Sequence, residues 1–180
     1  MNQGIINTVA AHWTPPEKLL LSEWADKYAR LSPESSAEIG RWKTYPYQRS
    51  SLDALIDPSI ETVSWMKSAR VGYTKLLNWD TAFHIAQEPC SQLIVQPTVE
   101  DASGYSKDEI APMLRDMPAM ENLVVESRIK DSGNTILKKQ FPGGILHLVG
   151  ANSARGLRRI TVKRVKFDEV DGYPATAGNE

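Results

Sequence analysis

Residues 67–75 of the chain read Lys67-Ser68-Ala69-Arg70-Val71-Gly72-Tyr73-Thr74-Lys75. The stretch is similar to a phosphate-binding loop, whose standard form is a glycine, four residues of any kind, and then Gly-Lys followed by Ser or Thr. An alignment on Gly72 places Thr74 at the hydroxyl position. Tyr73 then takes the usual lysine position, and Lys67 takes the first-glycine position. The loop therefore has the parts of a phosphate site, with its lysine displaced.

A loop of this kind binds phosphate through its backbone. Small residues let the N–H groups face the phosphate oxygens, and the following helix adds the positive end of its dipole. Gly72 can adopt the backbone angles of such a turn. Thr74 sits where a hydroxyl would bind Mg²⁺, and Lys67 could fold back over the β- and γ-phosphates, with further charge from Lys75 and Arg70. A plain strand–helix turn with solvated side chains is the alternative.

A second motif lies downstream, where residues 164–169 read Arg164-Val165-Lys166-Phe167-Asp168-Glu169. It predicts a strand that ends in two carboxylates. Phosphoryl transfer needs a carboxylate near the metal ion and a group that orients the attacking water. Asp168 could supply the first and Glu169, on the other side of the strand, could act as general base. Together the two motifs have the layout of a nucleotide-hydrolysing motor.

Hydrophobic periodicity predicts helices alternating with strands. The expected helices cover residues 17–29, 47–56 and 73–86 and part of 99–117. The expected strands cover residues 60–66, which should form the first core strand, and then 92–96, 135–140, 144–149 and 159–167. Residues 142–144 form a turn, 1–15 a lead-in and 31–44 a polar loop. This alternation predicts an α/β fold with a mainly parallel sheet flanked by helices.

The composition is that of one soluble globular domain, with 180 residues, 41% hydrophobic and 24% charged. The formal net charge of −1 gives no overall attraction to nucleic acid or membrane. Cys90 is the single cysteine, so an internal disulfide is excluded and a reducing cytoplasm is the natural setting. The sequence has neither a signal peptide nor an apolar run long enough to span a membrane.

Charge is nevertheless uneven between Arg128 and Lys166. Basic residues dominate this stretch, and Asp131 is its one acidic residue. It could form a polyanion-binding surface, or it could be a solvated hairpin and strand edge. The basic residues are Arg128, Lys130, Lys138, Lys139, Arg155, Arg158, Arg159, Lys163, Arg164 and Lys166.

Three further groups of residues give weaker signals. Tyr45 and Tyr47 could stack on adenine while Gln48 reads its edge, or they could be core tyrosines at the start of a helix that Pro46 begins. The loop before the Asp-Glu strand could place Arg155, Arg158 and Arg159 against the γ-phosphate or DNA phosphates, or in solvent. The third group, His84 and His147, is expected to be structural, because no cluster has metal-ligand spacing.

With these residues in view, the chain resembles the N-terminal part of a tailed-phage terminase large subunit of the lambda-like DNA-packaging type. The resemblance extends from about Trp24 to Pro174, and the displaced-lysine loop is specific to this group. Its blocks occur in order as Glu23-Trp24-Ala25-Asp26, Gly40-Arg41-Trp42, Tyr45-Pro46-Tyr47-Gln48, residues 67–75, Val95-Gln96-Pro97-Thr98, Gly150-Ala151-Asn152-Ser153 and Phe167-Asp168-Glu169-Val170-Asp171.

The resemblance implies a P-loop ATPase of the additional-strand, catalytic-glutamate class that uses ATP and Mg²⁺. Lys67 would be the phosphate-loop lysine, Thr74 and Asp168 would hold Mg²⁺, Glu169 would activate water and Arg70 would stabilise charge. Adenine would contact Tyr45, Tyr47 and Gln48. Such motors work in the host bacterial cytoplasm as homo-oligomeric rings that drive double-stranded DNA into a prohead, with the terminase small subunit and the portal protein as partners.

The chain ends soon after Glu169, whereas family members continue with further core strands and a nuclease domain. We therefore expect a lead-in and helix over residues 1–44 and a truncated ATPase domain over 45–180, without the nuclease. Two alternatives remain. A helicase-like ATPase shares the loop, a Gln motif and the Asp-Glu strand, although the loop here lacks Gly-Lys-Thr. A non-catalytic module would instead bind terminase or portal partners.

Overall fold

The structure is a computed structural model, and it describes residues 17–124, 134–153, 158 and 160–175. The α-helices are α2 (Leu21–Tyr28), α3 (Pro46–Ala54), α4 (Tyr73–Ala86), α5 (Val99–Tyr105) and α6 (Ala111–Asp116). The strands are β1 (Arg30–Leu31), β2 (Gly40–Arg41), β3 (Gln92–Gln96), β4 (Lys138–Phe141), β5 (Gly144–Gly150) and β6 (Arg164–Phe167). Three short turns of helix complete it: a π-helix η1 (Ser106–Ile110) and the 3-10 helices η2 (Pro118–Met120) and η3 (Val170–Gly172).

The central sheet has four strands in the order β4-β5-β3-β6. β3 pairs in parallel with both of its neighbours, so Ile94 lies opposite Leu148 on one side and Lys166 on the other. β4 and β5 pair antiparallel across the turn at Pro142 and Gly143. The predicted α/β fold with a mainly parallel sheet is confirmed, as is the predicted hairpin. This mixed α/β arrangement fits a P-loop NTPase-like fold.

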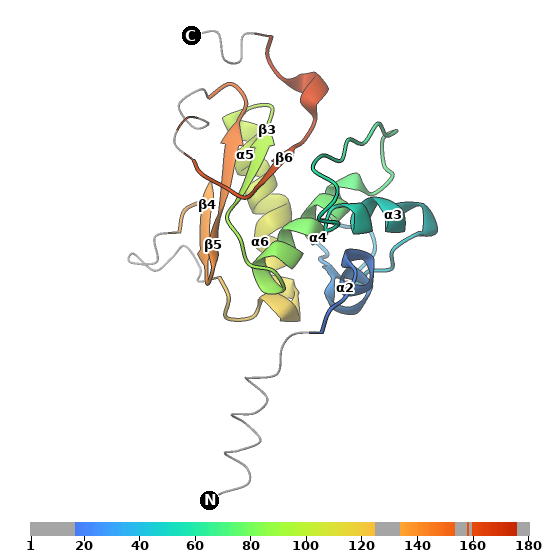
Figure 1. The fold of residues 1–180 in the computed structure, drawn as a ribbon. Coiled ribbons are helices and arrows are strands. Elements are labelled where there is room, and N and C mark those ends of the chain that lie inside the picture. Colours follow the sequence, from blue (N-terminus) through green and yellow to red (C-terminus); the bar gives the residue numbers. More distant parts are fainter. Residues whose placement is uncertain (1–16, 125–133, 154–157, 159, 176–180) are drawn as a thin grey trace, which may run out of the picture.

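Helix α4 is the centre of the molecule. Each of its residues from Leu76 to Ile85 is buried, so the helix is covered on all sides. Figure 1 shows α2 and α3 on one side of it and the sheet on the other. Trp24 of α2 meets Phe83 of α4 edge to face, with ring centroids 5.6 Å apart. The main hydrophobic core therefore lies between the N-terminal helices, α4 and the sheet.

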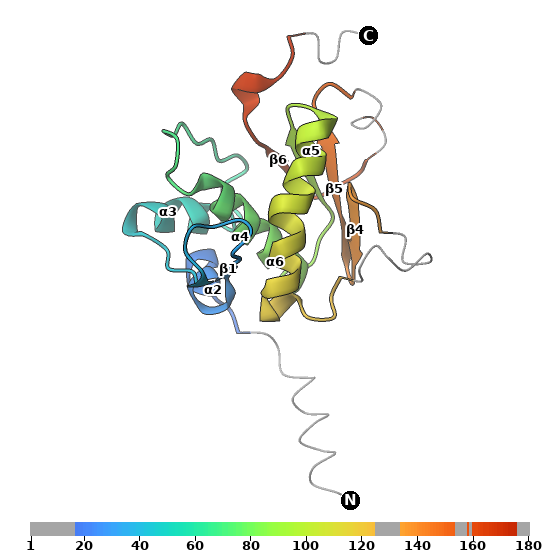
Figure 2. The same ribbon diagram turned by 180° about the vertical axis from the view of Figure 1, so that it is seen from behind.

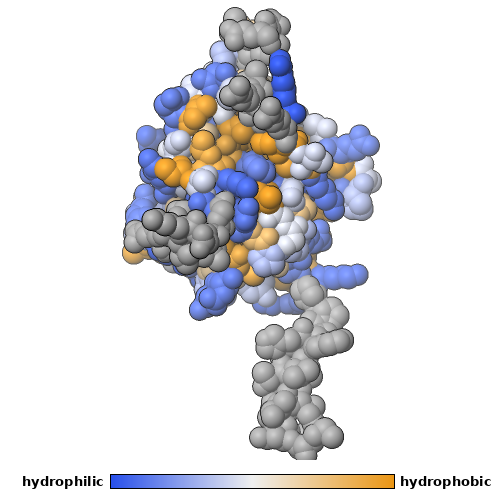
Figure 3. Space-filling view, turned by 90° about the vertical axis from the view of Figure 1, so that its left-hand side faces the viewer, coloured by the Kyte–Doolittle hydropathy of each residue, from blue (hydrophilic) through white to orange (hydrophobic). Residues whose placement is uncertain are grey.

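The two faces of the sheet are covered differently. Ile94 of β3 points into the main core, whereas its neighbours Leu93 and Val95 belong to a second, smaller cluster. That cluster contains no helical residue, and the segment around Ile160 and Val162 packs against it. Figure 3 shows hydrophobic residues gathered in the upper part of the side that faces left in Figure 1. Helices of the described residues thus cover one face.

The prediction of a strand over residues 60–66 is wrong. This segment has no regular secondary structure, and most of its residues are exposed. A strand needs a neighbour to pair its backbone N–H and C=O groups, and no described strand lies beside this segment. The backbone of this β-rich segment therefore remains unpaired. The phosphate-loop motif follows it directly, so the motif follows an irregular segment.

Other boundaries differ in smaller ways. The loop predicted over residues 31–44 contains the two-residue strand β2, which pairs with β1. The helical stretch within 99–117 is interrupted by the π-helix η1, and the last strand begins at Arg164 rather than at residue 159. Residues 1–15 lie outside the described residues. No described helix is long and apolar enough to cross a membrane.

The fold brings both motifs to one edge of the sheet. Parallel strands end at the same edge, so Gln96, Gly150 and Asp168 lie at or next to the carboxyl ends of neighbouring strands. Figures 1 and 2 show α4 running antiparallel to β3, with its N-terminus towards that edge. Ligands bind at this edge in open α/β sheets.

Candidate phosphate-binding site

The loop before α4 exposes backbone at the start of a helix. Residues 66–70 are exposed, and Gly72 caps the helix with φ +82°, a left-handed conformation that favours glycine. Arg70 also has a positive φ, +62°. Within the described residues, the N–H groups of Tyr73 and Thr74 find no hydrogen-bond acceptor, as expected for a first helical turn. Free N–H groups together with a helix dipole are the features of a typical anion-binding site.

Gln48 supports this loop from α3. Its side chain is buried, and its Nε2 donates a 3.0 Å hydrogen bond to the carbonyl of Val71. The Tyr47 hydroxyl donates to the same carbonyl at 3.3 Å. A Cβ on Gly72 would lie 3.0 Å from Gln48 Nε2. Residues far apart in the sequence thus hold the loop at the position where it turns.

Tyr45 and Tyr47 form an exposed aromatic pair beside the loop. Their rings are nearly parallel, at 9°, with centroids 5.7 Å apart. Neither ring belongs to the buried core, in contrast to the alternative that they are core tyrosines. A flat, exposed aromatic surface next to a phosphate loop is suited to stacking on a base. The structure therefore brings together the three residues predicted for adenine and the loop predicted for phosphate.

Lys67 folds back over the start of α4. Its ammonium lies 5.1 Å from the centroid of the Tyr73 ring. Tyr73 in turn meets Trp65 edge to face, with centroids 4.8 Å apart. The displaced lysine is thus held over the residue that occupies the usual lysine position of a phosphate loop.

Lys75 is engaged elsewhere. Its ammonium pairs with the Glu109 carboxylate at 2.7 Å and donates to the Ser35 hydroxyl at 2.9 Å. Asn78 bonds the same oxygen of Glu109 at 2.7 Å. A contact between Lys75 and a phosphate would require these bonds to break, so Lys67 and Arg70 are the loop cations that remain exposed to a ligand.

Asp168 follows β6 at the carboxyl edge of the sheet. It is buried, its N–H donates to the carbonyl of Val95 at 3.0 Å, and its Oδ2 accepts a 3.0 Å hydrogen bond from Gln96 Nε2. Tyr173 O–H donates to the same Val95 carbonyl at 2.8 Å. The carboxylate is therefore held in a fixed place by β3 and keeps acceptor capacity for a metal ion.

The two motifs lie close enough to interact electrostatically. Burial raises the pKa of the Tyr73 hydroxyl to about 12, with a further contribution from the Asp168 carboxylate. Burial and then Asp168 also raise the pKa of Tyr105. The start of α4 and the end of β6 therefore share one electrostatic environment, with Thr74 and Asp168 as the candidate ligands of Mg²⁺.

Glu169 differs from its neighbour in both exposure and backbone. It is exposed, and its φ of +49° is left-handed. Arg70, Asn122 and Glu169 are the non-glycine residues with positive φ in the part of the chain that the structure describes. Strained backbone of this kind clusters at functional sites, and two of these three residues belong to the candidate site.

The basic stretch is not one continuous surface. Lys139 and Lys166 are buried, and Arg164 donates to the carbonyl of Leu55 at 2.8 Å. Arg158 is exposed, whereas Arg155 and Arg159 lie outside the described residues, as do Arg128, Lys130 and Asp131. Part of the predicted polyanion surface is therefore turned inward.

The histidines are placed as expected for structural residues. His84 is buried against Asp80, with 3.1 Å between Nδ1 and Oδ1. His147 is half-buried in β5, and burial lowers its pKa. No cluster of three or more metal-binding side chains occurs among the described residues. A Mg²⁺ ion shared with a nucleotide needs only one or two protein ligands, so this result is compatible with Thr74 and Asp168.

From the sequence, Gln96 is named only within a sequence block and is assigned no role of its own. It ends a strand that is buried throughout, and its amide reaches across to the next strand. A polar residue at the carboxyl end of a central parallel strand was the available signal, because such ends line the ligand edge.

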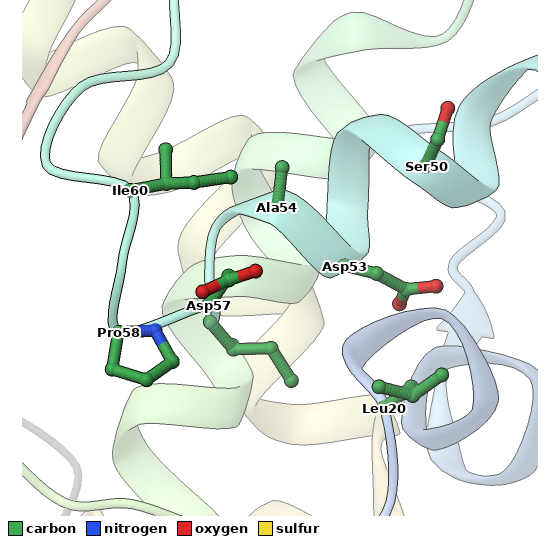
Figure 4. Close-up of a pocket in the computed structure, with 8 residues that line it drawn as sticks. Leu20, Ser50, Asp53, Ala54, Asp57, Pro58 and Ile60 are labelled. Atoms are coloured by element: carbon green, nitrogen blue, oxygen red, sulfur yellow. The ribbon is translucent and has the colours of Figure 1, made fainter.

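An open hollow lies away from this site, between the start of α2 and the end of α3 (Figure 4). It is lined by Leu20, Ser50, Asp53, Ala54, Ile56, Asp57, Pro58 and Ile60. Asp53 already accepts bonds from the backbone and side chain of Ser22, at 2.8 and 3.0 Å. Asp57 accepts from Ser59 in the same way, so the carboxylates of the hollow are engaged within the chain.

Comparison with known proteins gives consistent matches. Residues 36–180 match the family model described as the ATPase domain of the phage terminase large subunit gpA. The chain is 35% identical over 171 residues to the terminase large subunit of Enterobacteria phage P21, which covers 94% of the chain and 27% of that protein. It is 34% identical over 159 residues to the terminase large subunit of Escherichia phage lambda, and this match covers 88% of the chain and 25% of the lambda protein. The chain thus spans about a quarter of these relatives. No solved structure is significantly similar to it.

Proposed function

Because the chain belongs to the family of phage terminase large subunits, in the region of their ATPase domain, we propose that it binds ATP with Mg²⁺ and hydrolyses it to drive the packaging of DNA. The observation that carries this proposal is that the free N-terminus of α4 and the buried Asp168 lie towards the same carboxyl edge of the sheet.

Each part of the site has a defined task in this proposal. The N–H groups at the start of α4 and the Lys67 ammonium bind the β- and γ-phosphates. The Thr74 hydroxyl and the Asp168 carboxylate would hold Mg²⁺, whose charge offsets that of the phosphates. Glu169 accepts a proton from the attacking water, and Arg70 stabilises the charge that spreads over the γ-phosphate oxygens. Tyr45, Tyr47 and Gln48 contact the adenine.

We assign the fold to the additional-strand class of these ATPases. β6 has β3 as its hydrogen-bonded neighbour, and its other edge pairs with no described strand. The β-rich segment 60–66 is unpaired as well. One more strand between β6 and this segment would pair both, and would extend the parallel sheet towards the phosphate loop.

Within a full-length terminase large subunit, this region would act in a homo-oligomeric motor in the host bacterial cytoplasm. Its partners would be double-stranded DNA, the terminase small subunit and the portal protein. The exposed members of the basic stretch, such as Lys163 and Arg158, would contact DNA phosphates. Affinity for DNA should then fall steeply as salt rises, because each neutralised phosphate releases counterions.

Two other functions remain to be separated from this one. A helicase-like ATPase would separate DNA strands in an ATP-dependent assay. A non-catalytic module would bind terminase or portal partners without turnover of ATP. The combination of Lys67, Asp168 and Glu169 supports hydrolysis over both.

The test compares the chain with Lys67→Ala and Glu169→Gln in Mg²⁺-dependent ATP binding and hydrolysis. We expect binding by the unaltered chain, much weaker binding by Lys67→Ala, and binding without turnover by Glu169→Gln. Lys18→Ala, an exposed lysine outside the site, serves as the matched control. Absence of ATP binding by the unaltered chain would contradict the proposal.

A further inference from the structure

A buried ion pair joins α4 to β6. Lys166 Nζ lies 2.8 Å from Asp80 Oδ2, and the two side chains are 6% and 3% exposed. Burial alone would raise the pKa of Asp80, but the charge of Lys166 and the hydrogen bond from His84 outweigh it and hold that pKa below its ordinary value. Neither residue has a part in the chemistry proposed above.

The Lys166 ammonium has further hydrogen-bond partners. Lys166 Nζ donates to Thr81 Oγ1 at 2.7 Å and to Gln92 Oε1 at 2.6 Å, so the three donors of the ammonium all have partners. Gln92 Nε2 donates to the carbonyl of His84 at 2.9 Å. The pair is therefore part of a connected network that spans α4, β3 and β6.

Stability alone does not account for such a pair. The cost of removing two charges from water offsets much of their attraction, and apolar replacements of similar shape are often as stable. The pair does set a specific distance between α4 and β6, because each charge is favourable only where it faces the other.

The pair connects the two segments that carry the candidate Mg²⁺ ligands. Asp80 lies six residues after Thr74 on α4, which is about 9 Å along a helix axis. Lys166 lies two residues before Asp168, on the same buried side of β6. The distance between Thr74 and Asp168 therefore depends on how α4 sits against β6 at the ion pair.

The backbone of the sheet does not fix this distance. β6 is a four-residue edge strand, and its hydrogen-bonded neighbour is β3 rather than α4. Side chains must therefore set the spacing between α4 and β6. Asp80 is a shared charged contact of the two elements, because it pairs with the buried Lys166 at 2.8 Å and lies 4.0 Å from the partly exposed Arg164 of the same strand.

We propose that Asp80 and Lys166 are positioning residues, whose ion pair sets the distance between the Thr74 hydroxyl and the Asp168 carboxylate and so prepares the Mg²⁺ end of the site. This inference rests on the proposed function, and it concerns the assembly of the metal site, not the chemical step.

The variants are Lys166→Met, Asp80→Asn and the double variant. The double variant removes both charges at similar volume, so we expect it to be close to the unaltered chain in thermal stability. Leu146→Ala, in the buried core of β5, is the control for lost stability without a change at the pair. Thr81→Val removes one hydrogen bond to Lys166 and keeps both charges, so it extends the test if the double variant does not fold.

The first readout is hydrogen exchange without nucleotide. The informative amides are those of Asp168, bonded to Val95, and Leu76, bonded to Gly72. We expect faster exchange at both amides in the double variant, and a smaller increase in Thr81→Val. Leu146→Ala should show no increase beyond its overall loss of stability. Exchange at the unaltered rate in a folded double variant would overturn the inference, whether or not the chain binds ATP.

The second readout separates metal from nucleotide. A fluorescent ATP analogue is titrated in EDTA and then across Mg²⁺ concentrations. We expect unchanged affinity in EDTA and a Mg²⁺ midpoint that rises about tenfold in the double variant, as for other residues that orient metal ligands. An unchanged midpoint in a stable double variant would make the pair merely structural. Absence of nucleotide binding by the unaltered chain would defeat the proposed function, and hydrogen exchange would still decide the inference.

Discussion

In the proposed phosphate site, Tyr73 would allow the loop to operate with its lysine displaced. The aromatic ring stands where the standard loop carries its lysine, and it lies beneath the ammonium of Lys67. Such a cation–π contact contributes about 0.5–1 kcal/mol at an exposed site. Trp65 packs against the same ring and fixes its orientation. Position 73 therefore carries an aromatic ring that supports the Lys67 ammonium, in place of a lysine of its own.

Moving the lysine back should restore the site. We expect Lys67→Ala to lose most ATP affinity, and Lys67→Ala combined with Tyr73→Lys to recover part of it, because the second change rebuilds the standard Gly-Lys-Thr order. Isothermal titration calorimetry with ATP and Mg²⁺ measures both. Tyr73→Phe keeps the platform and should bind like the unaltered chain. If the double variant recovers ATP binding neither in calorimetry nor in a nucleotide cross-linking assay, the loop geometry differs from the standard one.

Gly72 carries a separate prediction. Alanine at this position would have to adopt φ +82°, which costs about 1–2 kcal/mol for a residue with a side chain. Its Cβ would also press on Gln48, the side chain that holds the loop. Gly72→Ala should therefore weaken ATP binding while secondary structure stays unchanged by circular dichroism. Gly104→Ala, within α5 and without a close neighbour, should leave binding unaltered.

Single residues were predictable from sequence where a local motif fixed their place in an element. The loop glycine and the strand-end carboxylate fall in this class, and their placement at one edge follows from parallel topology. The Gln96–Asp168 and Asp80–Lys166 contacts join residues separated by 72 and 86 positions. Periodicity describes which side of an element a residue faces, but it does not identify the partner across a core.

At the scale of elements, local pattern was sufficient for α4, β3 and the β4–β5 hairpin, because each carries its own apolar spacing or turn residues. It failed for residues 60–66. β-branched and aromatic residues favour a pleated, paired surface, and a segment with that composition remains irregular where no described strand pairs with it. It also missed β1 and β2, whose two residues each are too short for any period.

The docking of α2 on α4 gives a prediction at this scale. Trp24 is 1% exposed and packs on both Phe83 and Tyr28. Trp24→Ala should lower the free energy of unfolding by about 3–5 kcal/mol, since it leaves a large cavity in the core. Urea denaturation measures this loss, and Leu20→Ala, at a half-exposed site, should change it little. A normal urea midpoint for Trp24→Ala would mean that α2 does not unfold with the core.

At the scale of the whole molecule, one side of the sheet is left with exposed apolar groups. Val165, Phe167 and Val170 are 47%, 55% and 59% exposed. They lie on and just after the edge strand β6, and the segment that ends with Met66, itself fully exposed, is unpaired. Exposed apolar edge strands favour pairing with another chain. The same surface is where the proposed additional strand would add.

We therefore expect this chain to self-associate through β6 as its concentration rises. Sedimentation velocity should show a concentration-dependent increase in the average sedimentation coefficient, and Val165→Lys should reduce it, because a charge on an edge strand opposes pairing. Ile39→Lys is the matched control, since Ile39 is 72% exposed but lies beside β2 rather than β6. An equal reduction by both variants would indicate general solubility instead of a specific edge.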